Sequence, residues 1–534
     1  MSLLVEGAAV VATARGTRPL AGARQGALEL FPGAVVRCEG PGIAFVGERR
    51  EHDRRFPAAD ETLDAGGGTV LPGFVDPHTH LPFAGFREGE FDRRLAGESY
   101  AAIAASGGGI VATVAARRRA SFAELLALTL HRLDFQLAGA RQGALELFPG
   151  AVVRCEGPAI AFVGERCEHD RRFPAADETL DAGGGTVLPG FVDPHTHLPF
   201  AGFRESEFDR RLAGESYAAI AASGGGIVAT VAATRRASFA ELLALTLRRL
   251  DLQLAGGTTT TEAKSGYGLD LGGELKQLRV LREAARRHPV EIVPTAMPAH
   301  EVPPEWRHDP ERYLDLVVSE IYPAIAAEGL AEQVDVFCER GVFTPEQTRR
   351  LLADAGRHRW RIHLHADELC DLGGAALAAE LGATAAAHLM HACPAGIAAM
   401  AARGVVAIVL PGVSFFLRDR FAPVRSLVDA GVPVAVATDC NPGSSHTESM
   451  PAVIALACLG AGLTSEEAIV AATLNAAAAL GRAARLGSVE AGKQADLAIL
   501  DAPSPKHLVY HFGVNLVRHV VKGGRVVVRD GARV

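Results

Sequence analysis

The stretch Val187-Leu-Pro-Gly-Phe-Val-Asp-Pro-His195-Thr-His197 joins an apolar run to two histidines separated by one residue. The apolar run is typical of a buried strand, and side chains at positions i and i+2 of a strand point to the same face. The imidazoles of His195 and His197 can therefore reach a common point and bind a divalent metal ion. The alternative, two ordinary polar residues at a strand end, is weaker because Asp-Pro precedes them and Phe-Ala-Gly-Phe-Arg follows.

The same motif occurs a second time, at Asp76–His80, as part of a long repeat. Residues 22–138 match residues 139–255 at an offset of 117, which separates His78 from His195. The copies differ at six pairs of positions: Gly42/Ala159, Arg50/Cys167, Gly89/Ser206, Arg117/Thr234, His131/Arg248 and Phe135/Leu252. Solenoid repeats are shorter and more divergent, so this repeat indicates a recent tandem duplication or an assembly artefact that mimics one.

The duplication does not predict two sites. Nothing resembling residues 256–488 follows the first copy, so only one set of partner residues exists for two histidine pairs. Removing one copy from the 534 residues leaves 417, which we take as the functional length.

Composition limits the class of protein. With 48% hydrophobic residues the chain can bury a large core, and a net charge of −8 with mixed signs argues against a nucleic-acid partner. Apolar stretches are broken by glycine, proline or charge, and the N-terminus lacks the pattern of a signal peptide, so we expect no membrane association. Eight cysteines without Cys-x-x-Cys spacing fit a reducing cytosol. The expected partner is a small-molecule substrate, and a homodimer is one possible oligomeric state.

From residue 187 onward, β-rich runs alternate with helical patterns, which predicts an α/β chain with a parallel (β/α)₈ barrel of the TIM type. The predicted strands are Val187–Val192, Thr258–Glu262, Val290–Thr295, Val334–Cys338, Arg361–His365, Ala385–His388, Val405–Leu410 and Val434–Thr438. The predicted helices include Phe239–Gln253, Leu271–His288, Pro345–Arg357 and Gly373–Leu381. Polar residues gather at the C-terminal ends of the strands, the face that carries the chemistry in such barrels: His195, His197, Glu262, His300, His365, His388 and Asp439.

The two ends of the chain have a different sequence pattern from the barrel. They are β-rich with glycine turns, and they predict a small β domain assembled from both termini through Ala8–Ala14, Gly33–Gly47, Leu497–Leu500 and His519–Val528. We therefore expect residues 1–75 and 489–534 to form the small β domain, 187–488 the barrel, and 76–186 a surplus segment.

Spacing suggests how the metal site is completed. His365 ends the run Arg361-Ile-His-Leu-His, and Asp439 follows an apolar strand. With one histidine pair they would form a mononuclear site with an open position for water, whereas a structural zinc site would be closed by further ligands. For His363, two residues before His365, a satisfied histidine in or beneath the barrel is the better interpretation.

Several longer motifs resemble those of the amidohydrolase superfamily and, within it, the imidazolonepropionase family of histidine degradation. The resemblance covers the chain apart from the extra copy. It rests on Asp193-Pro-His-Thr-His-Leu-Pro-Phe-Ala-Gly-Phe-Arg204, Ser223-Gly-Gly-Gly-Ile, Thr259-Thr-Thr-Glu-Ala-Lys-Ser-Gly-Tyr-Gly-Leu, Ala299-His-Glu-Val-Pro-Pro-Glu, His365-Ala-Asp-Glu368, Ala387-His-Leu, Leu410-Pro-Gly and Thr438-Asp-Cys-Asn-Pro-Gly-Ser444.

The resemblance implies a role for each matching residue. The implied metal ligands, for one zinc or iron ion per chain, are His195, His197, His365 and Asp439. Arg204 matches an arginine that holds the substrate propionate, and the residues that match contacts to the imidazolone ring are Tyr267, His300 and Glu368. The implied contacts to the ring-opened product are Asn441, Gly443 and Ser444.

Two positions depart from the family pattern. The family usually has aspartate before the histidine where this chain has Ala387 before His388, so an orienting carboxylate at that position is missing. The usual Gly-Ala-His reads Pro298-Ala-His300 here. Lys264 resembles the carboxylated lysine of binuclear relatives, but its Lys-Ser-Gly-Tyr setting is typical of the mononuclear group, so we interpret it as structural.

The implied reaction is hydrolysis of the cyclic amide of 4-imidazolone-5-propanoate to N-formimidoyl-L-glutamate. A metal ion can supply hydroxide at neutral pH, Asp439 can carry the proton, and His388 or His300 can stabilise the oxyanion. The alternatives are an amidohydrolase acting on a purine- or triazine-like ring, and a catalytically dead duplicated variant.

We expect the second copy to supply the site. It runs without a break into Gly256-Gly-Thr-Thr, whereas using the first copy would place 117 extra residues in one connection of the barrel. The opposite assignment, to His78, His80 and Arg87, has in its favour that the first copy follows the N-terminal strands directly.

Overall fold

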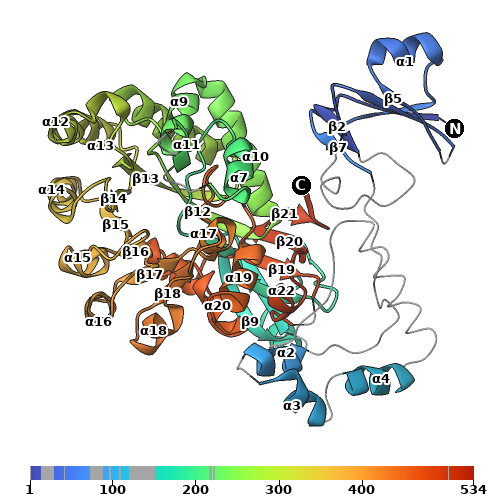
Figure 1. Cartoon of the computed structure of the whole chain (residues 1–534). Coiled ribbons are helices and arrows are strands. Elements are labelled where there is room, and N and C mark those ends of the chain that lie inside the picture. Colours follow the sequence, from blue (N-terminus) through green and yellow to red (C-terminus); the bar gives the residue numbers. More distant parts are fainter. Residues whose placement is uncertain are drawn as a thin grey trace. The chain divides into compact units, whose positions relative to one another are not determined.

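A computed structural model describes most of the chain, as two compact units, Met1–Leu81 and Pro82–Val534 (Figure 1). The described residues are 2–13, 29–40, 42–72, 88–95, 98–106, 110–119, 151–215, 219–220, 223–502 and 504–534. His78, His80 and Arg87 lie outside them, so the structure says nothing of the first copy of the metal motif.

The larger unit contains a parallel sheet of eight strands in sequential order, which confirms the predicted (β/α)₈ barrel. Hydrogen bonds from Asp439 N to His195 O (3.0 Å) and from His197 N to Cys440 O (3.1 Å) join its two ends. The strands are β11 (Phe191–Asp193), β12 (Thr258–Lys264), β13 (Glu291–Ala299), β14 (Gln333–Cys338), β15 (Arg361–Ala366), β16 (Ala385–His388), β17 (Val406–Val409) and β18 (Val434–Val436).

Helices surround the barrel, as Figure 1 shows. Among the described helices, three begin with a reciprocal capping box, in which the hydroxyl of Ser238, Thr344 or Thr464 accepts a hydrogen bond from the backbone N–H three residues later. The helices are α7 (Glu205–Leu212), α9 (Ile227–Arg236), α10 (Phe239–Ala255), α11 (Leu271–Arg287), α12 (Pro310–Leu316), α13 (Tyr322–Ala327), α14 (Pro345–Ala355), α15 (Gly374–Glu380), α16 (Pro394–Arg403), α17 (Pro411–Leu417), α18 (Val424–Asp429), α19 (Met450–Leu459), α20 (Ser465–Ala471), α21 (Leu474–Ala479) and α22 (His507–Tyr510).

The hydrophobic core of this unit includes a layer between strands and helices. Helix residues such as Leu250 and Leu278 share one buried cluster with strand residues such as Val336 and Leu364. This packing holds the strands rigidly and so positions the residues at their C-terminal ends.

A small β domain stands beside the barrel in the same unit. Its five-stranded sheet has the order β10 (Thr186–Pro189), β19 (Leu497–Leu500), β20 (Val517–Lys522), β21 (Arg525–Arg529) and β22 (Ala532–Arg533). A hairpin of β8 (Ala151–Glu156) and β9 (Ala159–Glu165), followed by α6 (Arg166–Arg172), packs against it through Ile160, Leu497 and Val521.

This arrangement corrects the predicted domain boundaries. The C-terminal strand β19 pairs with β10, and Gln494 forms a bridge with Ala159, so the partners lie in the second copy; no pairing with the described residues of 1–75 is seen. The predicted strand Val187–Val192 is in fact two strands, β10 and β11, broken at Gly190. A side chain at Gly190 would meet the side chain of Thr259 at 2.4 Å, so only glycine fits at this break.

The smaller unit is built from the N-terminal residues and the first copy. One sheet has the order β5 (Gly42–Gly47), β4 (Val35–Glu39), β1 (Ser2–Glu6) and β6 (Glu61–Asp64), and a second has β3 (Glu29–Pro32), β2 (Val10–Thr13) and β7 (Thr69–Val70). Helix α1 (Arg49–Arg55) follows β5. Three further helices of the first copy, α2 (Glu88–Leu95), α3 (Tyr100–Ala105) and α4 (Ile110–Arg119), belong to the larger unit.

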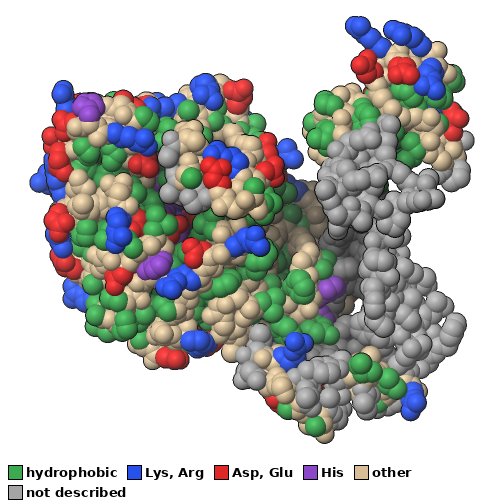
Figure 2. Space-filling model, in the orientation of Figure 1, with side chains coloured by type: hydrophobic (Ala, Val, Ile, Leu, Met, Phe, Trp, Pro, Cys, Tyr) green, Lys and Arg blue, Asp and Glu red, His purple; other side chains and the backbone are tan. Residues whose placement is uncertain are grey.

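The surface of the barrel mixes positive and negative side chains on the face that Figure 2 shows, in keeping with the modest net charge. Within the described part of the chain, no helix has both the length and the apolar character that a membrane crossing requires.

Candidate metal centre and substrate site

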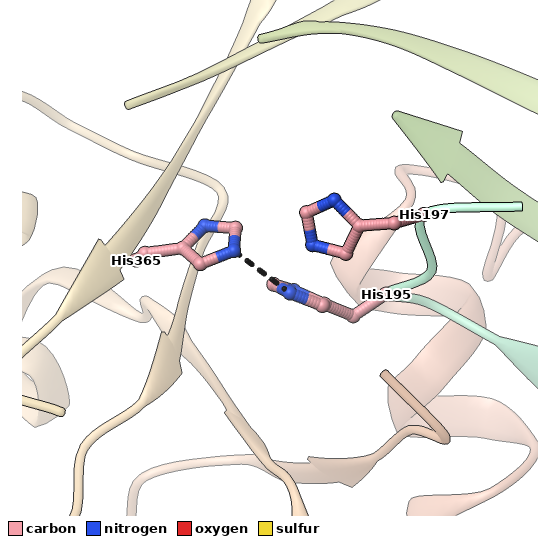
Figure 3. Close-up of side chains that lie close together, drawn as sticks. All are labelled: His195, His197 and His365. Carbon is pink, nitrogen blue, oxygen red and sulfur yellow. Dashed lines mark hydrogen bonds between the residues drawn. The ribbon is translucent and has the colours of Figure 1, made fainter. Parts of the chain in front are cut away.

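Three imidazole rings converge at the C-terminal end of the barrel, as Figure 3 shows. His195 and His197 follow β11, and His365 lies near the end of β15. Their ligand atoms all lie within 4.8 Å of one another, and Nε2 of His195 lies 3.1 Å from Nε2 of His365. The predicted His-x-His geometry therefore brings two rings from one strand end to a third from across the barrel.

Asp439 lies beside the three histidines. Its Oδ1 is 3.5 Å from Nε2 of His195 and 3.5 Å from Nε2 of His197, and it has no hydrogen-bond partner among the described residues. Its Oδ2 accepts a hydrogen bond from Nδ2 of Asn441 at 2.9 Å. Asn441 thus holds one oxygen of the carboxylate and leaves the other directed at the histidines.

The donor set fits a metal ion. Burial lowers the pKa values of His195, His197 and His365, so each ring is neutral at neutral pH and has a lone pair to offer. Without a metal ion, burial raises the pKa of Asp439 to about 8, although the charge of Lys264 and hydrogen bonds from Asn441 and Ser444 oppose the rise. A bound cation would lower this pKa and keep the carboxylate charged. Three imidazole nitrogens and a buried carboxylate oxygen that lacks a partner are the ligands expected for zinc or iron.

Backbone strain marks the same region. His388, Leu389, Asp367 and Asp439 all have positive φ values, of 71°, 60°, 50° and 49°. Residues other than glycine rarely adopt this conformation, and such strain concentrates at functional sites.

A buried ionic network lies behind His365. Nζ of Lys264 is 2.8 Å from Oε1 of Glu262 and 3.1 Å from Oδ2 of Asp335. The other oxygen of Asp335 lies 3.0 Å from Nδ1 of His365 and accepts a bond from the His365 backbone N–H at 3.0 Å. Although burial opposes ionisation, His365 and Lys264 lower the pKa of Asp335, so this carboxylate stays charged and orients the imidazole.

The aspartate of the Asp-Pro-His-Thr-His motif has a different task. Asp193 accepts hydrogen bonds from the backbone N–H and the hydroxyl of Thr438, at 3.1 and 2.6 Å, and from Gln253 at 3.0 Å. It ties β11 to the residues after β18, and so links the segments that supply His195 and Asp439.

Two aromatic side chains flank His197. The His300 ring is stacked on it, with centroids 4.8 Å apart, and Tyr267 lies 5.6 Å away. Nδ1 of His300 lies 3.0 Å from the carbonyl oxygen of Gly266 and donates to it, and burial lowers the pKa of His300 to about 3. The neutral ring therefore presents Nε2 as a hydrogen-bond acceptor.

His388 and Glu368 form a second pair near the metal ligands. Nδ1 of His388 lies 3.5 Å from Oε2 of Glu368. Glu368 thus places a carboxyl group beside this ring, although the preceding residue, Ala387, has none. Burial, and the negative charge of Asp439, raise the pKa of Glu368 to about 8. At neutral pH Glu368 is largely protonated and can donate a hydrogen bond.

Arg204 lies against the loop that follows Asp439. It is the residue immediately before α7, and its Nε and Nη2 donate to Oε2 of Glu207 at 2.9 and 2.7 Å. A side chain at Gly443 would come within 2.1 Å of Nη1 of Arg204, so the guanidinium lies directly on this glycine. Asn441 shapes the loop by accepting hydrogen bonds from the backbone N–H groups of Gly443 and Ser444, at 2.8 and 2.9 Å.

The residues singled out from the sequence thus gather at one end of the barrel. His363 lies beneath the site, as expected; its Nε2 lies 3.0 Å from the carbonyl oxygen of Ala479, and its Nδ1 has no hydrogen-bond partner among the described residues. Sequence reasoning missed Asp335 and Glu207. An aspartate inside the apolar run Val334-Asp-Val-Phe, and a glutamate three residues after Arg204 on a helix, were the signals that could have identified them.

Comparison with known proteins gives concordant results. Residues 186–527 match the model of the amidohydrolase family. An imidazolonepropionase from Geobacillus kaustophilus (strain HTA426) is 52% identical over 390 residues, which make up 72% of this chain and 92% of that protein. An imidazolonepropionase from Symbiobacterium thermophilum is 51% identical over 397 residues, covering 74% of this chain and 93% of that protein.

Solved structures share the fold at lower identity. An adenosine deaminase from Xanthomonas campestris with bound zinc has a TM-score of 0.57 at 21% identity, over 72% of this chain and 90% of that one. A 5-methylcytosine deaminase from Klebsiella pneumoniae has a TM-score of 0.58 at 18% identity, over 73% of this chain and 97% of that one. At these identities the likeness concerns the fold alone.

Proposed function

Since this chain belongs to the amidohydrolase family and, within it, to the imidazolonepropionases, we propose that it hydrolyses 4-imidazolone-5-propanoate to N-formimidoyl-L-glutamate, a step of histidine degradation. The observation that carries this conclusion is identity of about half over more than nine-tenths of the relatives' length. The buried His₃Asp cluster at the C-terminal end of the barrel is the site suited to the chemistry.

We assign the metal ion to the second copy of the motif, through His195, His197, His365 and Asp439. Three observations support this assignment: the convergence of the rings, the oxygen of Asp439 without a partner, and the start of the family match at residue 186. One zinc or iron ion per chain satisfies these ligands. When bound, such an ion lowers the pKa of a coordinated water to about 7 and so supplies a nucleophile at neutral pH.

The chain's own groups account for the proton transfers. Water adds to the carbonyl carbon of the ring amide while Asp439 accepts its proton, and the carbon–nitrogen bond breaks as Asp439 returns that proton to the leaving ring nitrogen. His300, which presents Nε2, can accept a hydrogen bond from a ring N–H. The His388 ring lies 5.0 Å from that of His365, with Glu368 beside it; Glu368 can donate a hydrogen bond to the substrate ring and His388 to the developing oxyanion.

The propionate tail distinguishes this substrate from other cyclic amides. Arg204 is the cation that lies on the Gly443 loop, and a guanidinium suits a carboxylate because its planar N–H groups match the two oxygens. We propose that Arg204 binds the tail, that Tyr267, His300 and Glu368 surround the ring, and that Asn441, Gly443 and Ser444 line the path of the opened product.

The test measures, with the purified full-length chain and after metal analysis, the turnover of 4-imidazolone-5-propanoate, of guanine and of other cyclic amides. Turnover of 4-imidazolone-5-propanoate, with about one zinc or iron ion per chain, is the expected result. Release of ammonia from guanine without ring opening of the imidazolone would overturn the assignment in favour of another amidohydrolase. One bound ion with no turnover of any cyclic amide would mean that the duplicated chain is catalytically dead.

A further inference from the structure

The guanidinium of Arg204 is held along one edge by a carboxylate on its own helix. Glu207 lies in the first turn of α7, and its Oε2 accepts from both Nε and Nη2 of Arg204. Both side chains are buried. A charge-assisted contact to two nitrogens of a planar group restricts its rotation as well as its position.

The second oxygen of Glu207 is engaged by another segment. The backbone N–H of Gly226 donates to Oε1 at 3.1 Å, in the Gly-rich turn that leads into α9. A side chain at Gly225 would lie 2.8 Å from the same oxygen, so this turn closes tightly on the carboxylate. Glu207 is therefore fixed from two sides, and it fixes Arg204 in turn.

The orientation of Arg204 matters because of what lies on the opposite side of the guanidinium. With Nε and Nη2 turned to Glu207, Nη1 is the nitrogen that lies against Gly443. The Gly443 loop is held by Asn441, which also bonds to Oδ2 of Asp439. A short chain of contacts thus runs from Glu207 through Arg204 to the loop beside the metal ligands.

We propose that Glu207 is a positioning residue that determines where the substrate carboxylate binds. By holding the Nε–Nη2 edge of Arg204, it turns Nη1 toward the Gly443 loop and so aligns the ring amide with Asp439. This inference rests on the proposed function. It also implies that Glu207, by balancing part of the charge of Arg204, weakens the binding of the substrate carboxylate but gives it a defined orientation.

The decisive variant is Glu207→Gln, which keeps the shape of the side chain and removes its charge. We expect kcat to fall about 10-fold or more, the factor for losing one charge-assisted hydrogen bond, while KM stays unchanged or falls. A substrate with an ethyl group in place of the propanoate should change by less than about twofold, since Arg204 has nothing to position there. Glu207→Asp, which keeps the charge but shortens the reach, should be intermediate.

The first copy provides the matched control, because Glu90 occupies the position equivalent to Glu207. Glu90→Gln should leave kcat and KM at parental values. Equal losses in the two variants, equal losses on the two substrates, or a rise in KM with kcat unchanged would each overturn the positioning role. If thermal unfolding shows that Glu207→Gln does not fold, the same comparison is made with Glu207→Asp.

A binding measurement separates this inference from the proposed function. If the parent chain does not turn over the imidazolone, the proposed function fails, and calorimetric titration with imidazole-4-propanoate and 4-ethylimidazole still tests Glu207. Unchanged or tighter binding of the carboxylate probe by Glu207→Gln supports the inference. A loss of about tenfold in its affinity contradicts it.

Discussion

Two hairpins of this molecule have almost the same sequence and the same local structure, yet different surroundings. The β4–β5 hairpin belongs to the first copy, and the β8–β9 hairpin belongs to the second. In each, an arginine donates to a proline carbonyl beyond the following helix, Arg37 to Pro57 at 2.9 Å and Arg154 to Pro174 at 2.8 Å. Local sequence is therefore sufficient for the hairpin and its helix.

The surroundings decide what is buried. Ile43 in the first hairpin is 71% exposed, whereas the equivalent Ile160 is 1% exposed because it packs on the C-terminal strands. Conversely, β4 pairs with β1, while among the described strands β8 pairs with β9 alone. Nearly the same hairpin sequence thus buries different residues in its two settings, which shows that tertiary contacts override local preference.

The largest difference expected between the copies is in catalysis. Alanine at His195 and His197 should reduce turnover to background, because it removes two of the four proposed metal ligands, and bound metal measured after dialysis should fall with it. Alanine at His78 and His80 should spare both turnover and metal content. The reverse pattern would assign the site to the first copy, and two tightly bound ions per parent chain would contradict a single site.

The next difference is in stability. Ile160→Ala should cost about 2–5 kcal/mol, the range for truncating a buried aliphatic side chain. Ile43→Ala should change stability by less than about 0.5 kcal/mol, as at exposed positions. Loss of activity in denaturant reports the unfolding of the unit that contains the catalytic site. The denaturant concentration at which half the activity is lost should therefore drop only for Ile160→Ala. Equal drops would mean that the two hairpins are equally buried in solution.

A smaller effect is expected at the substrate tail. Losing a charged hydrogen bond costs about 1.5–3 kcal/mol, so Arg204→Ala should reduce kcat/KM roughly 10- to 150-fold. Arg87→Ala, the equivalent change in the first copy, should have no effect. Arg204→Lys should restore only part of the loss, because an ammonium lacks the planar fork. Equal sensitivity of a substrate without the carboxylate would show that Arg204 is structural.

The smallest difference concerns backbone protection. Amides of β4 that face β1 should exchange slowly, and the equivalent amides of β8 should exchange faster, because no described strand covers that edge. Peptides from the two copies can be told apart by mass, since Gly42 corresponds to Ala159. Equal protection would mean that another strand covers β8 in solution.

The barrel could be predicted because its information is local. The strands are short β-rich runs that alternate with helical patterns, and polar residues follow where strands end, as at His195 and Asp439. The break at Gly190 could not be predicted, because it depends on Thr259, which meets β11 only in the folded barrel. The small β domain was misassigned for a related reason: the copies differ too little for sequence to indicate which one pairs with the C-terminal strands.

The site was predictable only as far as its motifs extend. His-x-His and the positions of His365 and Asp439 were sufficient to suggest four ligands. The contacts that orient them were not visible, because Asp335 reaches His365 from the neighbouring strand and Lys264 reaches Asp335 across the barrel interior. Glu207 was missed since an arginine and a glutamate three apart on a helix are usually a surface pair.

The edge of β8 that no described strand covers is explained by where the repeat begins. The repeat begins at residue 22, after β1 and β2, so the second copy contains the counterpart of β4, the strand that pairs with β1, but no counterpart of β1 itself. Loss of 117 residues between matching positions yields a 417-residue chain that is nearly the same wherever the break falls. That chain has one donor strand for one acceptor hairpin.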